Sequence, residues 1–394
     1  MSVVKKNHME NNGPAGWRRC RVQGPSKRMC RAGKASTTPV RLWIEEGCEA
    51  EPLACRVREA FRDIPSETIA PGCRPLSQGH TWTLRRQRGR FLKPCPGTPN
   101  YLCCGYRVLN LVLGCPFQCT YCILQDYLGQ EGITVFVNLE DSLREVREFT
   151  ARKGGLVRVG TGELGDSLAL EHWLRTSETL VPFFASLSNA VLELKTKSDC
   201  VDSLLDLPHG GHTVVSWSMN PQALIQWAEA ETASLDQRLH AARECQERGY
   251  PLGLHLDPMV LIDGWEEQYR EAIEMIFRIL EPEGILWISM GGLRYPPSLQ
   301  KRLLRSGLGL GEFFPGLDGK FRYLRPLRAR MFHNAAQWIR ELGGDVLIYL
   351  CMESPEIWEA SLGWAPMGMS QLDRLFQERI KGFWQRRWPS SCGV

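Results

Sequence analysis

Three cysteines lie close together in the segment GCPFQCTYCILQ, where Cys115, Cys119 and Cys122 follow a CxxxCxxC spacing directly after a predicted strand. Cysteine thiolates are the ligands of iron–sulfur clusters, and a four-iron cluster held by three of them keeps one iron open for a substrate or cofactor. A structural zinc site would need a fourth protein ligand and commonly uses pairs of cysteines. The spacing therefore favours a catalytic iron–sulfur cluster, with a zinc loop or three buried core thiols as the alternatives.

The composition supports metal or redox chemistry over a disulfide scaffold. The chain has 394 residues, of which 43% are hydrophobic and 23% charged, so general disorder and a fibrous fold are excluded. It contains fifteen cysteines, an odd number, and its N-terminus lacks the apolar stretch of a secretory signal. No apolar run approaches the ~18 residues of a membrane span. We expect a cytoplasmic protein without a membrane partner.

The charge is unevenly distributed along the chain. Residues 1–40 contain nine Lys or Arg residues and one acid, Glu10, whereas the whole chain has a net charge of +4. The remaining residues are therefore slightly acidic. A basic leader without hydrophobic periodicity predicts a flexible, solvated tail, and attraction to nucleic acid is the alternative.

Short β-rich runs alternate with longer helical patterns after Tyr106. The predicted strands are 107–113, 156–160, 190–196, 213–219, 252–256 and 285–290, and the predicted helices are 139–150, 167–187, 200–207, 235–248 and 265–280. Parallel strands need crossover connections, so this α/β alternation indicates a parallel sheet covered by helices. Polar residues gather just after the strands, as they do at the active rim of a barrel. We predict a partial (β/α)6 TIM-type barrel.

Four regions follow from this pattern. They are a disordered basic tail at 1–40, an irregular Cys-rich N-terminal layer at 41–105, the partial barrel at 106–295, and an α+β C-terminal extension at 296–394. Within the extension, the pattern predicts helices at 321–342 and 369–388 and a strand at 346–352.

The CxxxCxxC loop, placed after the first strand of a six-fold βα alternation, resembles the radical S-adenosylmethionine (SAM) superfamily. The resemblance implies that SAM chelates the open iron of a 4Fe-4S cluster and is cleaved to a 5′-deoxyadenosyl radical. The segment Thr161-Gly162-Glu163 looks like the superfamily's GGE element beside the SAM amino group. Lys197 is a candidate for holding the SAM carboxylate, and Ser218 and Asn220 for binding its ribose; a solvated strand-end lysine is the alternative for Lys197.

Six segments, in family order, resemble spore photoproduct lyase and its relatives, which reverse a thymine dimer in DNA. They are GCPFQCTYCILQDYL, TKSDCVDSLL, SMNP, GYPLGLHLDPMVLIDGWEEQYR, WISMGGLRYPPSL and YLCMESPEIWE, within residues 91–363. The resemblance implies a carbon–carbon lyase of DNA repair in which Lys197 and Ser218 contact SAM. It also implies that Tyr121 relays the radical and that a reductase such as flavodoxin or ferredoxin supplies electrons.

Two positions depart from the family pattern. Gly160 stands where the characterised lyases have a cysteine that returns a hydrogen atom to the product radical, and Ile123 replaces a second relay tyrosine. Another thiol of the segment CPGTPNYLCCGY can supply the hydrogen atom. Cys95, Cys103 and Cys104 therefore have three open interpretations: a hydrogen donor, a second cluster, or plain buried thiols.

Basic and aromatic residues alternate near the end of the barrel and suit DNA, because aromatic rings stack on bases and basic groups contact phosphates. Candidates for DNA contact are Arg294, Tyr295, Arg322 and Arg325. An amphipathic helix whose Arg stems cover apolar surface is the alternative.

Three hypotheses result. The first is a spore photoproduct lyase-like radical SAM enzyme acting on thymine lesions in DNA. The second is the same radical chemistry on a different substrate, favoured by Gly160 and Ile123. The third is a zinc-dependent DNA-binding module without catalysis.

Overall fold

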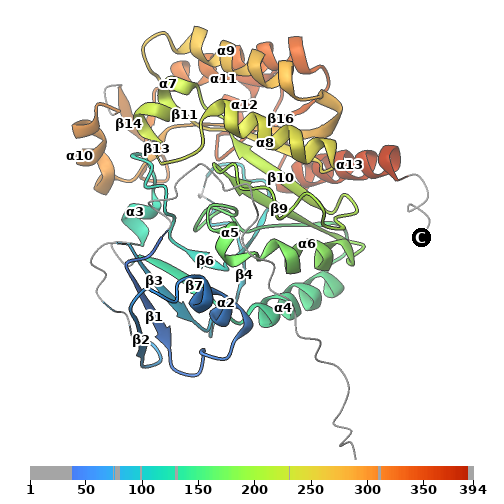
Figure 1. The fold of residues 1–394 in the computed structure, drawn as a ribbon. Helices are drawn as coiled ribbons and strands as arrows, with labels where there is room; N and C mark the ends of the chain where they lie inside the picture. Colours follow the sequence, from blue (N-terminus) through green and yellow to red (C-terminus); the bar gives the residue numbers. More distant parts are fainter. Residues whose placement is uncertain are drawn as a thin grey trace, which may run out of the picture.

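The computed structural model describes residues 38–73, 75, 80–97, 100–128, 132–229, 231–308 and 312–388, arranged in three sheets with helices around them (Figure 1). Residues 1–37 of the predicted basic tail lie outside these described residues. Among the helices described, none is long and apolar enough to cross a membrane.

The first sheet has five strands in the order β2-β1-β3-β7-β6. These are β1 (Arg41–Glu45), β2 (Ser66–Ile69), β3 (Thr81–Arg85), β6 (Val112–Leu113) and β7 (Ile133–Phe136), with α2 (Pro52–Ala60) between β1 and β2. Pairing is parallel except between β6 and β7. Leu42, Ile44, Trp82 and Leu84 form much of its core. The N-terminal layer is thus more regular than the irregular layer expected from its many Pro, Gly and Arg residues.

The second sheet is the predicted partial barrel, with eight strands in the order β16-β12-β11-β10-β9-β8-β5-β4. Its strands are β4 (Leu92–Pro94), β5 (Arg107–Leu109), β8 (Val157–Gly160), β9 (Ala190–Thr196), β10 (Thr213–Ser218), β11 (Leu252–Met259), β12 (Ile285–Gly292) and β16 (Leu347–Leu350). All neighbours pair in parallel except β4 and β5. Because helices cover its outer face, β10 and β12 are buried at every residue. The α/β partial-barrel prediction is confirmed.

The barrel helices match much of the predicted alternation, but several differ from it, and the short α3 and η1 were not predicted. They are α3 (Leu124–Tyr127), α4 (Leu139–Arg152), α5 (Glu171–Leu174), α6 (Ser177–Ala185), α7 (Gln222–Ala228), α8 (Leu235–Glu247), α9 (Trp265–Ile279) and the 3₁₀ turn η1 (Pro282–Gly284). The helix predicted at 167–187 is divided into α5 and α6, where Arg175 adopts a left-handed conformation. The segment 200–207 forms turns instead of the predicted helix, and α7 was not predicted.

The C-terminal region combines a small antiparallel sheet, β13-β15-β14, with helices. Its elements are β13 (Arg294–Tyr295), α10 (Pro297–Ser306), β14 (Phe313–Pro315), β15 (Phe321–Tyr323), α11 (Arg325–Gly343), α12 (Pro355–Leu362) and α13 (Met369–Arg387). The helix predicted at 321–342 begins only at Arg325, because Pro326 suits a first helical turn and residues 321–323 pair with β14. The predicted domain boundaries remain predictions.

Position 160, at the end of β8, is packed against a tyrosine of the neighbouring strand. β5 and β8 pair with Val108 opposite Gly160, and Tyr106 stands just before β5. A Cβ atom on Gly160 would lie 1.3 Å from the Tyr106 hydroxyl oxygen. The phenol therefore occupies the space that any side chain at position 160 would need.

We expect Gly160→Ala to lower the free energy of unfolding by about 1–3 kcal/mol, because the Tyr106 ring must move. In a Tyr106→Ala background the same change should cost close to nothing, which gives a coupling free energy of about 0.5–3 kcal/mol in urea unfolding. Gly154→Ala is the control, since no atom lies within 4 Å of its added Cβ. An equal loss of unfolding free energy in both backgrounds would contradict the packing of Tyr106 against Gly160.

A buried carboxylate holds the carboxyl edge of the first sheet. The Glu45 side chain is fully buried, with Arg88 Nη2 at 2.9 Å and Arg85 Nη2 at 3.1 Å, and it accepts hydrogen bonds from the Gly72 and Arg86 backbone amides. Burial alone would raise its pKa, but these donors, Arg88 first, outweigh burial and lower it to about 2.

This carboxylate should make stability depend on pH in acid. Since the folded pKa of Glu45 lies below the unfolded value of 4.5, its stabilisation is complete above that value and is lost as the pH falls towards 2. The stability difference between the wild type and Glu45→Gln should therefore shrink over this range in urea titrations. Exposed Glu59→Gln is the control. A difference that stays constant with pH would refute the prediction.

Candidate functional site

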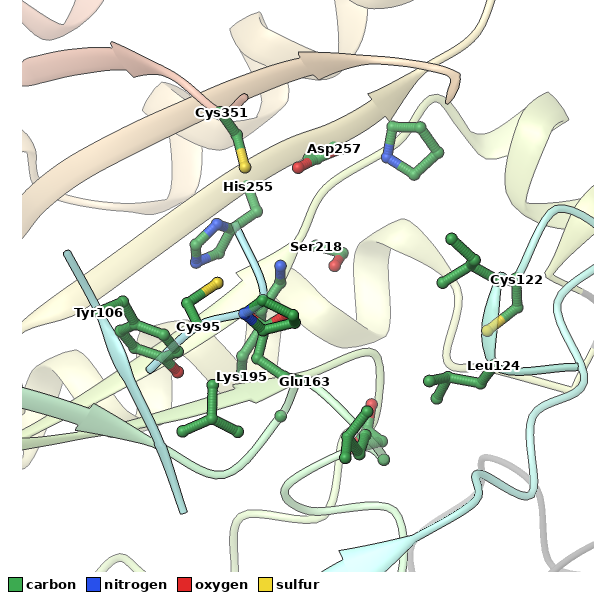
Figure 2. A pocket seen from close by; sticks show the side chains of 18 of the residues that line it. Cys95, Tyr106, Cys122, Leu124, Glu163, Lys195, Ser218, His255, Asp257 and Cys351 are labelled. Atoms are coloured by element: carbon green, nitrogen blue, oxygen red, sulfur yellow. The ribbon is translucent and has the colours of Figure 1, made fainter. Parts of the chain in front are cut away.

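A cavity of about 660 Å³ opens at the carboxyl ends of the barrel strands (Figure 2). Its walls come from the cysteine loop, from the residues that end β9, β10, β11 and β12, and from segments 93–96 and 103–110. Loops at the carboxyl ends of several strands converge here, as the barrel prediction implies.

The cysteine loop joins β6 to α3, and its backbone is shaped by two positive φ angles. Gly114 has φ +94°, and a Cβ there would lie 2.7 Å from the Gly132 carbonyl oxygen. Gln118 has φ +48°. The loop is fastened by hydrogen bonds from the Thr120 amide to the Ala228 carbonyl (2.9 Å) and from Gln125 Nε2 to the Cys119 carbonyl (2.8 Å).

All three predicted cluster cysteines, Cys115, Cys119 and Cys122, line the cavity. Burial raises the pKa of each thiol, so these groups are protonated in the metal-free protein and would lose protons on binding iron. Three thiols on one loop, with open cavity beside them, fit a 4Fe-4S cluster that keeps one iron accessible. They do not complete a four-ligand zinc site by themselves.

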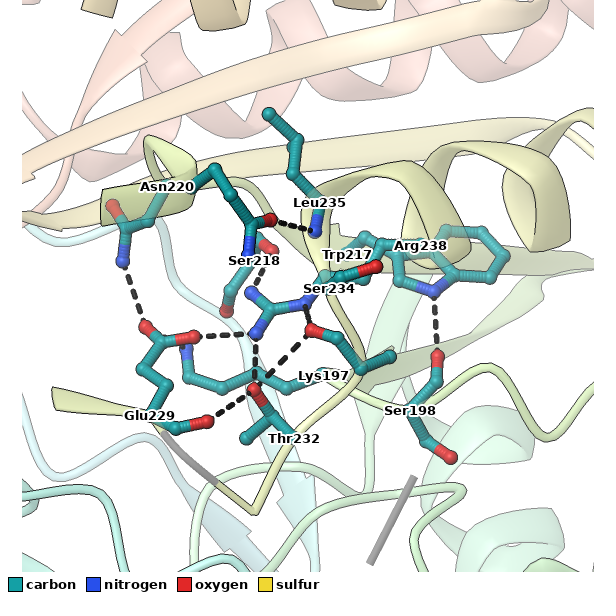
Figure 3. A network of polar contacts seen from close by, with 12 residues as sticks. Lys197, Ser198, Trp217, Ser218, Asn220, Glu229, Thr232, Ser234, Leu235 and Arg238 are labelled. Carbon is teal, nitrogen blue, oxygen red and sulfur yellow. Dashed lines mark hydrogen bonds and ion pairs between the residues drawn. The ribbon is translucent and has the colours of Figure 1, made fainter. Parts of the chain in front are cut away.

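A buried carboxylate, Glu229, contacts three of the predicted site residues, of which Lys197 and Asn220 are labelled in Figure 3. Tyr121 donates its hydroxyl proton to Glu229, Asn220 Nδ2 donates to Glu229 Oε1 at 2.8 Å, and Lys197 Nζ lies 3.6 Å from the same oxygen. Arg238 completes the set, with Nη2 2.5 Å from Glu229 Oε2. Burial alone would raise the pKa of Glu229, but Lys197 and Arg238 lower it to about 2.

Neither Glu229 nor Arg238 was predicted. Glu229 stands in the sequence WAEAE beside the similar Glu231, and only the fold distinguishes the buried acid from the exposed one. Arg238 Nη1 also donates to the Ser218 carbonyl at 2.8 Å, so α8 fixes the end of β10.

The Thr161-Gly162-Glu163 segment contributes two of its three residues to the cavity. Gly162 and Glu163 line it. Thr161 turns away and donates its hydroxyl to Ser167 Oγ at 2.7 Å. A Cβ on Gly162 would lie 2.9 Å from the Lys195 Cβ, so glycine permits this close approach to β9.

Ser218 lines the cavity, whereas Asn220 lies behind it and contacts Glu229. The far wall carries further charged groups, for which the sequence pattern predicted only that polar residues follow the strands. His255 Nε2 lies 3.0 Å from Glu193 Oε1, and its Nδ1 lies 2.6 Å from Ser289 Oγ. Burial lowers the pKa of His255. Burial would raise the pKa of Glu193, but His255 outweighs burial and lowers it to about 2.

Lys195 and Arg294 extend this charged wall. Arg294 Nη1 lies 3.1 Å from Asp257 Oδ1, and this pair lines the cavity with Lys195. Burial would raise the pKa of Asp257, but Arg294 and then Lys195 outweigh it and lower the pKa to about 2. Lys195 could have been found from alternation, because it lies two residues before Lys197 near the end of β9.

The predicted DNA-contact residues are not brought together. Arg294 lines the cavity, and Arg325 is exposed at the start of α11. Tyr295 is buried against Phe313, and Arg322 is buried with Nη2 2.8 Å from Asp318 Oδ2. DNA contact by Tyr295 and Arg322 does not fit these positions, because their ring and charge are already packed inside the protein.

A basic helix that was not predicted lies next to the cysteine loop instead. On α10, Lys301, Arg302 and Arg305 are exposed. The helix meets α3 through Ser298 Oγ, which donates to Asp126 Oδ2 at 2.8 Å. The positive face of α10 therefore stands at the cysteine end of the cavity.

Comparison with known proteins agrees with this architecture. Residues 104–289 match the family model of spore photoproduct lyase. The chain is 34% identical over 175 residues to spore photoproduct lyase of Geobacillus sp. (strain Y412MC61), covering 44% of this chain and 51% of the relative. It is 32% identical over 165 residues to the Bacillus subtilis (strain 168) protein of that name, covering 41% and 48%. The matches thus span about half the length of these curated relatives.

Solved structures show the same fold. A spore photoproduct lyase variant with bound AdoMet and dinucleoside spore photoproduct superposes with a TM-score of 0.71 at 22% identity, covering 80% of this chain and 99% of that one. The lyase complexed with the dinucleoside alone gives a TM-score of 0.70 at 22% identity, with the same coverage of both chains. The region that contains most of the barrel and its cysteine loop, residues 104–289, is therefore similar to spore photoproduct lyase.

Proposed function

We propose that this protein is a radical SAM lyase that acts on thymine-dimer lesions in DNA, with a 4Fe-4S cluster on Cys115, Cys119 and Cys122. One observation carries the proposal. The three thiols open onto the same cavity as the charged and polar groups that end the barrel strands. When bound, the cluster and SAM supply a 5′-deoxyadenosyl radical; the chain binds, orients and shields the reactants.

The cavity offers complementary groups for each charged part of SAM. Glu163 is the acceptor for the amino group, and Lys197 is the cation for the carboxylate. Ser218 supplies a hydroxyl beside the ribose. Because Lys197 is already held 3.6 Å from Glu229, its ammonium is oriented before SAM binds. In this proposal, Thr161 and Asn220 position their neighbours without touching the cofactor.

Tyr121 is the proposed radical relay. Its ring lines the cavity, and its hydroxyl donates to Glu229. An oxidised phenol must release its proton, and the Glu229 carboxylate is the acceptor already in contact with it. Burial is the main cause that raises the pKa of Tyr121, so the hydroxyl stays protonated until the phenol is oxidised.

DNA is the proposed macromolecular substrate, and the basic face of α10 supports it. Lys301, Arg302 and Arg305 are suited to bind phosphates while a lesion enters the adjacent cavity. A lesion inside a duplex has to be extruded before a radical can reach it. A flavodoxin or ferredoxin is the proposed source of electrons.

A different substrate for the same radical chemistry is the second candidate. It is favoured by Gly160, where the family's hydrogen-donating cysteine is missing and Tyr106 fills the space.

Iron loading and SAM cleavage test the proposal. Anaerobically reconstituted wild type should bind about four irons per chain, cleave SAM to 5′-deoxyadenosine when reduced, and repair dinucleoside spore photoproduct. Ala at Cys115, Cys119 or Cys122 should abolish both reactions, because each thiolate holds one iron. Cys55→Ala, at an exposed position of α2, is the matched control and should behave as wild type.

The outcomes separate the candidates. SAM cleavage without repair would support the different substrate. A zinc-loaded protein that forms no 5′-deoxyadenosine would support the non-catalytic DNA-binding module. Undiminished SAM cleavage in any of the three cysteine variants would refute the cluster assignment.

Duplex binding should depend on salt through α10. Replacing Arg302 and Arg305 together by Ala should weaken binding of a short duplex and flatten the slope of log K against log salt by about 0.9 for each phosphate that the variant no longer neutralises. Arg152→Ala, on exposed α4, is the control for removal of a positive charge. An unchanged slope in the α10 variant would show that this helix does not contact the DNA backbone.

A further inference from the structure

The wall of the cavity formed by β4 and β5 brings a thiol and a phenol together. The Cys95 amide donates to the Tyr106 carbonyl at 2.9 Å, which continues the antiparallel register of these strands by one pair. Cross-strand partners point to the same face of a sheet. Both side chains line the cavity, and Figure 2 shows them beside each other.

Tyr106 fixes the geometry of this part of the wall. The residue is 5% exposed, and its buried hydroxyl packs against Gly160 of β8. The phenol therefore fills the end of β8, and the neighbouring Cys95 supplies a reactive group on the same wall of the cavity.

The thiols near this wall differ in their surroundings. Cys103 contacts the sulfurs of both Cys95 and Cys104, so the three form a chain. All three of these cysteines line the cavity, and so does Cys351. Cys104 lies next to Arg158, and Cys351 lies 3.7 Å from Arg294 Nη2 beside the Asp257 pair. Cys95 is the one that lies opposite Tyr106 across the strand pair.

We propose that the Cys95 thiol is the catalytic hydrogen-atom donor that quenches the product radical. It takes the place of a side chain at position 160, which Tyr106 excludes. This inference rests on the proposed function. A lyase started by hydrogen abstraction leaves a carbon radical on its product, and a redox-neutral product requires that a hydrogen atom be returned. An S–H bond on the cavity wall is the group suited to that step.

The step balances in atoms and electrons. The product carbon radical takes a hydrogen atom from Cys95, so the S–H bond breaks homolytically, a product C–H bond forms, and a thiyl radical remains on Cys95. One electron from a reduced flavodoxin- or ferredoxin-type protein and one proton from water restore the thiol.

Thiol alkylation tests the position of Cys95 independently of turnover. Under anaerobic conditions, iodoacetamide should modify Cys95 of the reconstituted protein, and dinucleoside spore photoproduct at ten times its Kd should slow this about tenfold by occupying the cavity. Cys55, read by the same peptide mass spectrometry, should react at an unchanged rate. Equal modification of Cys95 with and without bound dinucleoside would overturn the proposal.

Isotope transfer tests the chemical role. In D₂O the exchangeable thiol carries deuterium, so wild-type product should contain one deuterium from solvent. Cys95→Ser should still form 5′-deoxyadenosine, but the ratio of repaired dinucleotide to 5′-deoxyadenosine should fall about tenfold or more. Cys55→Ser is the matched control and should keep the wild-type ratio.

The results distinguish a failure of the proposed function from a failure of the Cys95 assignment. If wild type forms no 5′-deoxyadenosine, the proposed function falls and the donor role falls with it. If wild type repairs the dinucleoside and Cys95→Ser does so with the same ratio and deuterium content, only the donor assignment is overturned. Loss of repair in Tyr106→Phe together with normal repair in Cys95→Ser would also overturn it, in favour of the phenol.

Discussion

The site depends on the buried Glu229 carboxylate, to which the cysteine loop, two barrel strands and α8 are all tied. Tyr121 comes from the loop, Lys197 and Asn220 follow β9 and β10, and Arg238 comes from α8. A buried charge destabilises the fold unless it is paired and hydrogen-bonded. Removing one partner lowers the stability by more than the intact pair raises it. The network therefore acts mainly by specifying one arrangement, in which Lys197 stands at a fixed place beside the thiols.

Much of the architecture could be predicted because its signals are local. The CxxxCxxC spacing, the buried β runs and the amphipathic α9 are each contained in one short segment. The N-terminal sheet could not be predicted, because β3 pairs with β7 about fifty residues later across Pro- and Gly-rich loops. Glu229 was missed for a related reason: its burial depends on Arg238 and Lys197, which approach it only in the folded chain. Arg322 was predicted to contact DNA because its ion-pair partner, Asp318, is brought to it only by the turn before β15.

Two kinds of electrostatic environment share one cavity. At the cysteine end, burial keeps the thiols protonated until metal binds. At the far end, Asp257 and Glu193 keep depressed pKa values through Arg294 and His255. Asp257 and Glu193 are already paired and do not need to be neutralised by a ligand, which is compatible with the uncharged base of the proposed function.

The packing of Tyr106 against Gly160 excludes a side chain at the carboxyl end of β8. A side chain at position 160 and the phenol of Tyr106 exclude each other, since 1.3 Å is far below any contact distance. With Tyr106 in place no side chain fits at position 160, so any reactive group needed there must come from elsewhere on the cavity wall. β4 is the strand that can supply it, because its antiparallel pairing with β5 places Cys95 opposite Tyr106. Steric exclusion at the end of β8 is therefore the physical reason for proposing a donor beside β4.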